Sequence, residues 1–371
     1  MSSNNNQSIN DKGDLVKPKF TLLKIFLKTI VYCLVFELIL LTITAIPLSI
    51  YLNNQLNQFL KEARVSRQEF VEIATDAWNS PASSQRKTNF LVLGIDAMEN
   101  RGKPTLLTDT IMVVSLNNTT GKINLLSLPR DLWLADYQTK INALLYYGDQ
   151  RDSNNPTSFP KEVIENLTQT KIDHVVVMSL DNLKELIDLL GGVEIDVPEA
   201  FVDSEFPRND VDVNIVTDPK LLYEVVSFQK GKQIMDGELA LKYIRSRHSQ
   251  DEQGNDLARN NRQQEVVYAI FAKISNPMDL IKDPARAGRL FNYYQTNFEK
   301  YLPLNSLMAI GKSVVPVANQ ITFVGHGLDE YDETTQDGSI YHPNPKLYNN
   351  QWVYIIKDQT AFNQEIKNKL E

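Results

Sequence analysis

The longest apolar stretch of the chain runs from Thr29 to Leu52, and Glu37 is the only charged residue in it. About 20 consecutive apolar residues in a helix cross a bilayer, so this stretch is long enough to span a membrane. A carboxylate within a span is unfavourable by about 3 kcal/mol, and it marks a helix contact or a wet groove, or it has no role. The pattern predicts a transmembrane anchor over residues 29–52.

Apolar residues beyond this span recur at helical spacing. Leu56, Leu60 and Ala63 follow one another at steps of four and three, which places them on one face of a helix. Pro81 then begins a short stretch without periodicity. Residues 53–88 are therefore predicted to be a helical stalk or linker before the main domain.

The main domain opens with short apolar runs bounded by turn residues, which are typical of β-strands. Three such runs are predicted to be strands and cover residues 89–95, 111–116 and 122–128. The first leads into Asp96, the second follows Thr108-Asp109-Thr110, and the third ends at Pro129-Arg130. A polar loop joins the first two strands, and a turn joins the second to the third.

Strands and helices alternate in the following part of the chain. The pattern predicts helices from residue 140 and over 161–169 and 183–190, and strands over 175–178 and 193–197. The acidic stretch Asp203–Asp218 is interpreted as a loop. Residues 276–371 are predicted to be a helical extension with late strands near 321–324 and 352–356, packed on the same domain. This alternation predicts an α/β fold with both faces of the sheet covered.

Charge predicts how the chain is oriented in the membrane. Basic residues gather before the apolar span, where they are Lys17, Lys19, Lys24 and Lys28, and only Lys61 and Arg64 follow it closely. The positive-inside rule then makes residues 1–28 a cytoplasmic tail and places the main domain outside the cytoplasm. No small-residue cleavage site follows the span, so the sequence predicts a retained signal-anchor and a single-pass protein of the cell membrane.

Composition narrows the choice of partners. The chain has 371 residues, of which 42% are hydrophobic and 23% charged, as in ordinary globular proteins. Its net charge of −8 argues against nucleic acid as a partner. The only cysteine, Cys33, lies in the predicted span, so the exterior domain has no disulfides and depends on its apolar core.

The segment after residue 237 carries a group of arginines at informative spacings. Arg245 and Arg247 are two residues apart, so they point the same way only where the chain is extended. Arg259 and Gln263 are four apart in a predicted helix and therefore share one face. Two arginine pairs, 245 with 247 and 259 with 262, are predicted to clamp a phosphate or pyrophosphate. The alternative is that they are ordinary solvated helix positions.

Strand polarity brings a second group of polar residues together. A loop joins the end of the first strand to the start of the second, and the third strand returns to the same edge of the sheet. Asp96, Asp109 and Arg130 are therefore expected to meet there. Two carboxylates and an arginine suit a hard cation such as Mg²⁺ beside a phosphate. The alternative is that each aspartate has an ordinary role in a turn.

Other kinds of site have no support in the sequence. The histidines lack the spacing of zinc ligands, and His248, beside the arginines, is interpreted as a bystander. The chain contains no nucleophile elbow, phosphate-binding P-loop or dinucleotide-binding fingerprint.

Taken in order, these segments resemble the LytR–CpsA–Psr family of cell-wall phosphotransferases. The matching segments are LVLGIDAMENRG, LTDTIMVVSL, LLSLPRDLWL, KINALLYYGD, LIDLLGGVEIDV and DGELALKYIRSRHSQDEQGNDLARNNRQQEVV. The resemblance identifies residues 89–275 as a catalytic domain with a central mixed β-sheet flanked by helices, which holds an isoprenoid tail in an apolar tunnel.

The resemblance also implies an activity. A member of the family would transfer a glycopolymer from an undecaprenyl pyrophosphate carrier to a hydroxyl of peptidoglycan, with Mg²⁺ as cofactor. Asp96 and Asp109 would serve the metal and, with Arg130, catalysis. The pyrophosphate would be bound by Arg130, Arg245, Arg247, Arg259 and Gln263.

One position departs from the family's pattern. The family often has Arg-Ser-Asp-Thr before the second strand, and this chain has Leu107-Thr108-Asp109-Thr110. Arg101 or Lys103 in the preceding loop is the candidate to replace the missing arginine.

Two other activities stay open. The same residues fit a polyprenyl-pyrophosphate phosphatase, in which water is the acceptor. They also fit a non-catalytic protein that binds polyprenyl phosphate and regulates envelope assembly. The pair of aspartates favours an enzyme, because carboxylates beside a phosphate would weaken a pure anion site unless a metal lay between them.

Overall fold

The computed structural model describes residues 18–96, 106–208, 221–249, 252–275 and 282–371, with the isolated residues 211, 216 and 218. The chain divides into two compact units between Asn57 and Gln58. Helix α1, Pro18–Ala63, begins in the first unit, where its side chains from Lys24 onward are almost all exposed. Among the described helices, it alone is long and apolar enough to cross a membrane. The predicted cytoplasmic tail before residue 18 lies outside the described residues.

The predicted stalk is made of two helices. Helix α1 ends at Ala63, Arg64 has a left-handed φ of 58°, and α2 covers Arg67–Asn79. Ser66 and Glu69 begin α2 with a capping box, in which each side chain accepts a hydrogen bond from the other's backbone N–H. This pair of caps starts a new helix where apolar spacing alone suggested that the first one continued.

The centre of the second unit is a five-stranded mixed sheet. Its strands are β1 (Lys87–Ile95), β2 (Thr108–Asn117), β3 (Lys122–Ser127), β6 (His174–Ser179) and β11 (Thr322–His326), in the order β11-β3-β2-β1-β6. The pairs β1–β2 and β2–β3 are antiparallel, and β6 and β11 pair in parallel with β1 and β3. The predicted fold class, a mixed sheet between helices, is confirmed.

Helices and small hairpins surround this sheet. The other helices are α3 (Leu144–Arg151), α4 (Ser158–Thr168), α5 (Leu180–Leu189), α6 (Gly237–Arg245), α7 (Asp256–Ser275), α9 (Pro284–Asn297), α10 (Leu304–Val314) and α11 (Gln359–Leu370). The other strands are β4 (Trp133–Leu134), β5 (Thr139–Lys140), β7 (Val193–Val197), β8 (Phe201–Pro207), β9 (Tyr223–Phe228), β10 (Gly231–Met235), β12 (Ile340–Tyr341) and β13 (Ile355–Ile356).

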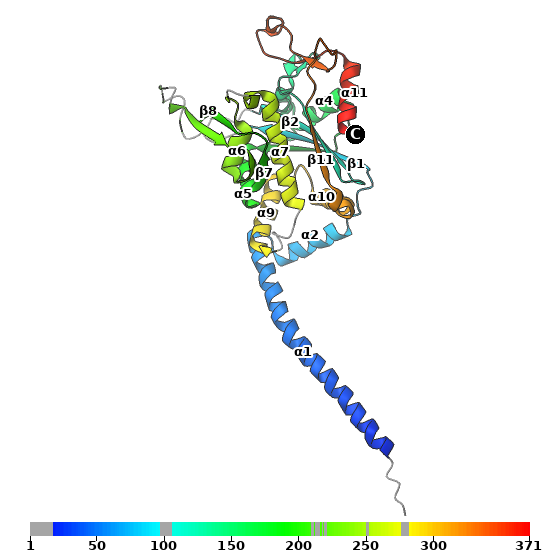
Figure 1. Ribbon diagram of the computed structural model, residues 1–371. Helices are drawn as coiled ribbons and strands as arrows, with labels where there is room; N and C mark the ends of the chain where they lie inside the picture. The colour runs from blue at the N-terminus through cyan, green and yellow to red at the C-terminus, as the bar shows by residue number, and fades with distance from the viewer. Residues whose placement is uncertain are drawn as a thin grey trace, which may run out of the picture. The chain divides into compact units, whose positions relative to one another are not determined.

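Alternation along the strands builds a core on each face of the sheet. Leu91 and Leu93 of β1 point to one face, where they pack with buried residues of α4 and α11. Phe90 and Val92 point to the other face, toward residues of α7 and α10. Figure 1 shows these two pairs of helices on opposite sides of the sheet. A third apolar cluster joins α5, α6 and α7 to the strands β7 to β10.

The interpretation of Asp203–Asp218 as a loop is wrong at its beginning. Residues 201–207 form β8, which pairs with β9, and Phe201, Asp203 and Phe206 are buried. Exposed Val202 and buried Asp203 reverse the usual places of apolar and charged residues, which hid the alternation of β8. Most of residues 209–220, like Arg101 and Lys103, lie outside the described residues.

The carboxyl-terminal segment completes the main sheet. Strand β11 forms its edge beside β3, and α11 covers the core that contains Leu91. The Gln264 amide of α7 donates to Ser127 Oγ at 2.8 Å and to the His326 carbonyl at 2.9 Å, which ties α7 to both strands. The late strand expected over 352–356 is shorter, since β13 covers only Ile355–Ile356.

Candidate functional site

A cavity of about 270 Å³ lies where β1, β2 and β6 meet α5, α6 and α7. Of the predicted site residues, all but Arg262 line it, namely Asp96, Asp109, Arg130, Arg245, Arg247, Arg259 and Gln263. His248, interpreted as a bystander, lines the cavity as well. Tertiary structure thus brings the two groups of polar residues into one site.

The aspartates reach the cavity from the ends of two neighbouring strands. In the antiparallel pair β1–β2, Gly94 is opposite Thr110 and Ile95 is opposite Thr108, so Asp109 is an extra residue at a shift of register. A shift of this kind is a β-bulge, which re-aims side chains and occurs often beside active sites. Asp109 and Thr110 both line the cavity, which two consecutive residues of a regular strand would not do.

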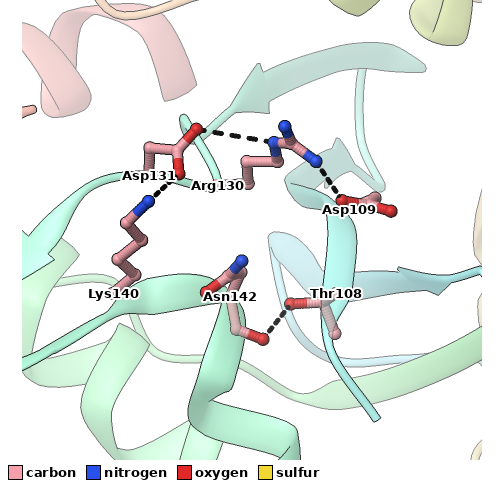
Figure 2. Close-up of polar contacts among 6 residues, drawn as sticks. All are labelled: Thr108, Asp109, Arg130, Asp131, Lys140 and Asn142. Atoms are coloured by element: carbon pink, nitrogen blue, oxygen red, sulfur yellow. Dashed lines mark hydrogen bonds and ion pairs between the residues drawn. The ribbon is translucent and has the colours of Figure 1, made fainter. Parts of the chain in front are cut away.

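A chain of ion pairs holds Arg130 at the cavity. Its Nη1 lies 2.5 Å from Asp109 Oδ1, and its Nε lies 3.5 Å from Asp131 Oδ2. Lys140 Nζ lies 2.6 Å from the other oxygen of Asp131, and Figure 2 shows the four side chains in a row. The Arg130 and Asp109 side chains remain 25% and 41% exposed, so both can be reached by a ligand.

Arg245 and Arg247 share the cavity because the helix ends between them. Helix α6 stops at Arg245, and Ser246 has extended backbone angles of φ −58° and ψ 131°. Both arginines line the cavity, as their two-residue spacing requires for an extended segment. The Arg245 guanidinium also lies 5.3 Å from the centre of the Phe206 ring, within the range of a cation–π interaction.

Asp203 orients this segment, and sequence reasoning missed it. Its side chain is fully buried, and Oδ2 accepts hydrogen bonds from the backbone N–H groups of Arg247 at 2.9 Å and His248 at 3.3 Å. A buried carboxylate needs such donors to offset the loss of its hydration. The spacing gave no signal for it, because Phe201 and Phe206 are five residues apart and share a buried face only through the irregularity between Asp203 and Phe206.

Arg262 does not belong to the clamp, which corrects the predicted second arginine pair. It is only 2% exposed, and it donates to the carbonyls of Tyr243 at 2.9 Å, Ser246 at 2.5 Å and Gln253 at 2.9 Å. Arg259 and Gln263 share the face of α7 that lines the cavity, whereas position 262 faces into the protein. Arg262 therefore fixes the loop that carries Arg247.

A buried hydrogen bond joins the two helices that carry the arginines. The Tyr243 hydroxyl of α6 donates to Glu265 Oε2 of α7 at 2.6 Å. Burial raises the pKa of Glu265 and also that of Tyr243. Neither side chain lines the cavity, so the contact joins α6 to α7 from outside the site.

The residues that line the cavity are of two kinds, charged and apolar. Four arginines outnumber two aspartates in the lining, so the site is locally positive in a protein of net charge −8. The remaining lining is largely apolar and includes Val92, Met112, Met178, Leu183, Ile244, Val266 and Val267. A ligand with an anionic group attached to a hydrocarbon chain matches both the arginines and the apolar residues.

Asp96 and Asp109 have the chemistry for a magnesium ion. Among the described residues, no three or more His, Cys, Asp or Glu side chains form a cluster that could hold a metal. Mg²⁺ does not need one, because it is often bound by one or two carboxylates, with water and substrate phosphates as its other ligands. Two aspartates beside arginines that can bind a phosphate fit that pattern.

Comparisons with known proteins all indicate the same family. The sequence profile of the LytR_cpsA_psr family matches residues 48–357, which extends well beyond the segments that carried the resemblance. A relative from Bacillus subtilis named polyisoprenyl-teichoic acid–peptidoglycan teichoic acid transferase TagV is 30% identical over 56% of this chain and 49% of its own length. The TagU transferase of Oceanobacillus iheyensis is 24% identical over 76% of each chain. The match to TagV thus spans about half of that relative.

Solved structures show the same fold. A protein of Enterococcus faecalis described as a transcriptional regulator superimposes with a TM-score of 0.52 and 22% identity, over 78% of this chain and 90% of its own. The crystal structure of B. subtilis TagV gives a TM-score of 0.50 and 23% identity, over 77% of this chain and 97% of its own. At such identities, the likeness concerns the fold alone.

Proposed function

Since this chain belongs to the LytR_cpsA_psr family, we propose that it transfers a glycopolymer from an undecaprenyl pyrophosphate carrier to a hydroxyl of peptidoglycan. One observation carries the proposal: a single cavity joins an apolar wall to four arginines and two aspartates. The arginines match a pyrophosphate, and the apolar wall matches the first isoprene groups of the carrier. The names of the curated relatives make teichoic acid the first glycopolymer to test.

The proposed reaction is an in-line phosphoryl transfer. The acceptor hydroxyl attacks the phosphorus that carries the sugar, a new P–O bond forms, and the bond to the polyprenyl phosphate breaks. Arg130, Arg245, Arg247 and Arg259 would neutralise the charge on the phosphate oxygens, which is most of what such chemistry requires. The hydroxyl proton would pass to a carboxylate, with Asp96 as the first candidate and Asp109 held by Arg130.

A magnesium ion fits this reaction as cofactor. Asp96 and Asp109 would hold it, and when bound it would supply positive charge beside the phosphates. Arg130 would then keep Asp109 in place through the ion pair already present.

The amino-terminal helix suits the proposed substrate. An undecaprenyl carrier stays in the membrane, and a membrane-anchored enzyme meets it at the surface of the bilayer. Helix α1 has the length and composition of such an anchor. We further propose that the anchor is retained, that the tail is cytoplasmic, and that the domain from residue 58 onward lies outside.

The deciding experiment uses the full-length protein in detergent with an undecaprenyl pyrophosphate-linked teichoic acid precursor, Mg²⁺ and peptidoglycan fragments. Mass spectrometry follows the sugar phosphate, with and without chelator. Metal-dependent attachment to the glycan is the expected result. Release into water even when acceptor is in excess would indicate a phosphatase, and tight binding without turnover would indicate a regulatory binding protein. Either of these outcomes would contradict the proposal.

A further inference from the structure

A group of aromatic and amide side chains lies on the surface beside the segment that carries Arg130. We call it the aromatic–amide face, and its members are Trp133, His342, Tyr348, Asn349, Asn350, Gln351 and Trp352. Trp352 is 54% exposed and the adjoining Leu347 is 77% exposed. Exposed large apolar groups that gather in one place mark interaction sites more often than scattered ones do.

The aromatic rings of this face contact one another in pairs. The Trp133 and Tyr348 rings lie edge to face with their centres 5.5 Å apart. The His342 and Trp352 rings are stacked, with an angle of 24° between their planes. The His342 Nδ1 also lies 2.7 Å from the Val353 carbonyl, which fixes the imidazole against the indole. Rings held by neighbours in this way lose little freedom when a ligand covers them.

Three residues with amide side chains lie between Tyr348 and Trp352 in the sequence. Tyr348 ends a short 3-10 helix, and Asn349 and Asn350 follow with left-handed φ angles of 56° and 58°. The side chains of Asn349, Asn350 and Gln351 are all exposed. Within the described part of the chain, none of the three amides makes a side-chain hydrogen bond, so their donors and acceptors are available to a ligand.

Backbone hydrogen bonds connect the face to the cavity. The Trp133 N–H donates to the Tyr354 carbonyl at 2.8 Å, and the Tyr354 N–H donates to the Asp131 carbonyl at 3.0 Å. Asp131 in turn pairs with Arg130, which lines the cavity. The face is therefore continuous with the segment that supplies a predicted phosphate ligand.

We propose that the aromatic–amide face binds the saccharide chain of the acceptor, an inference that rests on the proposed function. A pyranose ring has an apolar face of C–H groups, which packs on an aromatic ring, and a rim of hydroxyl groups, which bond to amides. The stretch Tyr348–Trp352 contains no charged residue, so it matches a neutral glycan rather than the anionic donor. The arginines hold the donor, and the face holds the acceptor beside it.

The three tryptophans of the chain make a direct test possible. Trp78, 82% exposed on α2, is away from this face, and the other two belong to it. In a full-length Trp78→Phe protein, fluorescence reports only on Trp133 and Trp352. Titration with soluble peptidoglycan glycan strands that lack stem peptides is expected to change it saturably. Inorganic pyrophosphate is expected to leave it unchanged.

Single substitutions then distinguish a loss of glycan binding from a loss of folding. Trp352→Ala is expected to weaken binding of the glycan strands, measured by calorimetry, and to raise the acceptor KM by about tenfold with kcat unchanged. Asn350→Gly removes one amide while keeping a residue that accepts the left-handed φ, so it is the variant that preserves the backbone. Trp78→Ala is the matched control, and no change in binding is expected from it.

Two results would overturn the inference. One is unaltered glycan affinity in both Trp352→Ala and Asn350→Gly. The other is binding that requires stem peptides, which would identify a peptide or protein partner instead. Failure of the proposed function is distinguishable, because the wild-type protein would then attach no sugar phosphate to the glycan while the fluorescence titration still showed glycan bound at the face.

Discussion

At the scale of single residues, the bulge at Asp109 has the clearest chemical consequence. It turns Asp109 into the cavity and places it 2.5 Å from Arg130. Replacement by Asn keeps the shape and removes the negative charge that pairs with the arginine. We expect Asp109→Asn to lower the transfer rate at saturating donor by about a hundredfold or more. Turnover equal to wild type would exclude a catalytic or metal-binding role for this carboxylate.

Asp203 is expected to affect donor binding without touching the donor. Its carboxylate fixes the backbone of Arg247 and His248, and each hydrogen bond to a buried charge contributes about 1.5–3 kcal/mol. Asp203→Asn should raise the donor KM by about tenfold, with a much smaller change in kcat. The neighbouring Glu205→Gln, an exposed position of the same strand, is the control. Equal effects of both substitutions on KM would argue against a positioning role.

His174 makes stability depend on pH in a defined direction. It stacks against Phe90, and burial lowers its pKa below the ordinary value of 6.5. The unfolded chain therefore binds a proton more readily than the folded one, so stability is retained above about pH 6.5 and lost as the pH falls below it. We expect denaturant midpoints to fall between pH 7.5 and 5.5, and to fall less in His174→Gln. His326 has a pKa lowered in the same direction and would account for part of the remaining slope.

At the scale of elements, α7 connects the cavity to the edge of the sheet. One face of α7 presents Arg259 and Gln263 to the cavity, while Gln264 bonds to β3 and β11. A methyl group at Gly325 would overlap the Gln264 side-chain oxygen. This close approach explains a glycine in the middle of an edge strand.

The contact between Gly325 and Gln264 can be measured by a double-mutant cycle. Gly325→Ala should lower the free energy of unfolding by about 1–3 kcal/mol, because it displaces an amide that makes two partly buried hydrogen bonds. Gln264→Ala removes the same amide and opens space for the methyl group. The double variant is therefore expected to lose less stability than the sum of the two single variants. Strict additivity would show that the side chains do not meet.

The sequence predicted most elements of the main sheet, because each of its strands is an apolar run with clear turn residues. It failed for β8 and β9, where exposed Val202 and Val225 and buried Asp203 depart from the usual pattern of apolar buried and polar exposed positions. It also failed at the boundary between α1 and α2, where a capping box rather than a change in apolar spacing starts the new helix.

At the scale of the whole molecule, the prediction that remains open is orientation in the membrane. Because Cys33 is the only cysteine, a Cys33→Ser background allows one reporter thiol at a time. Asn79→Cys, on exposed α2, is expected to react with a membrane-impermeant maleimide on intact cells, and Ser8→Cys only after lysis. The opposite pattern of labelling would reverse the predicted topology.

The sequence by itself determined the long apolar helix, the α/β class and the residue types of the site, because these follow from local periodicity, turn residues and charge. It also singled out Asp96, Asp109, Arg130, Arg245, Arg247, Arg259 and Gln263, which all line one cavity. Only the tertiary structure decided that Arg262 faces inward, that Asp203 holds the arginine segment, and that β11 forms the edge of the sheet beside β3. Each of these depends on carbonyls, N–H groups or strands far away in sequence, and no local pattern encodes which distant partner satisfies a buried polar group.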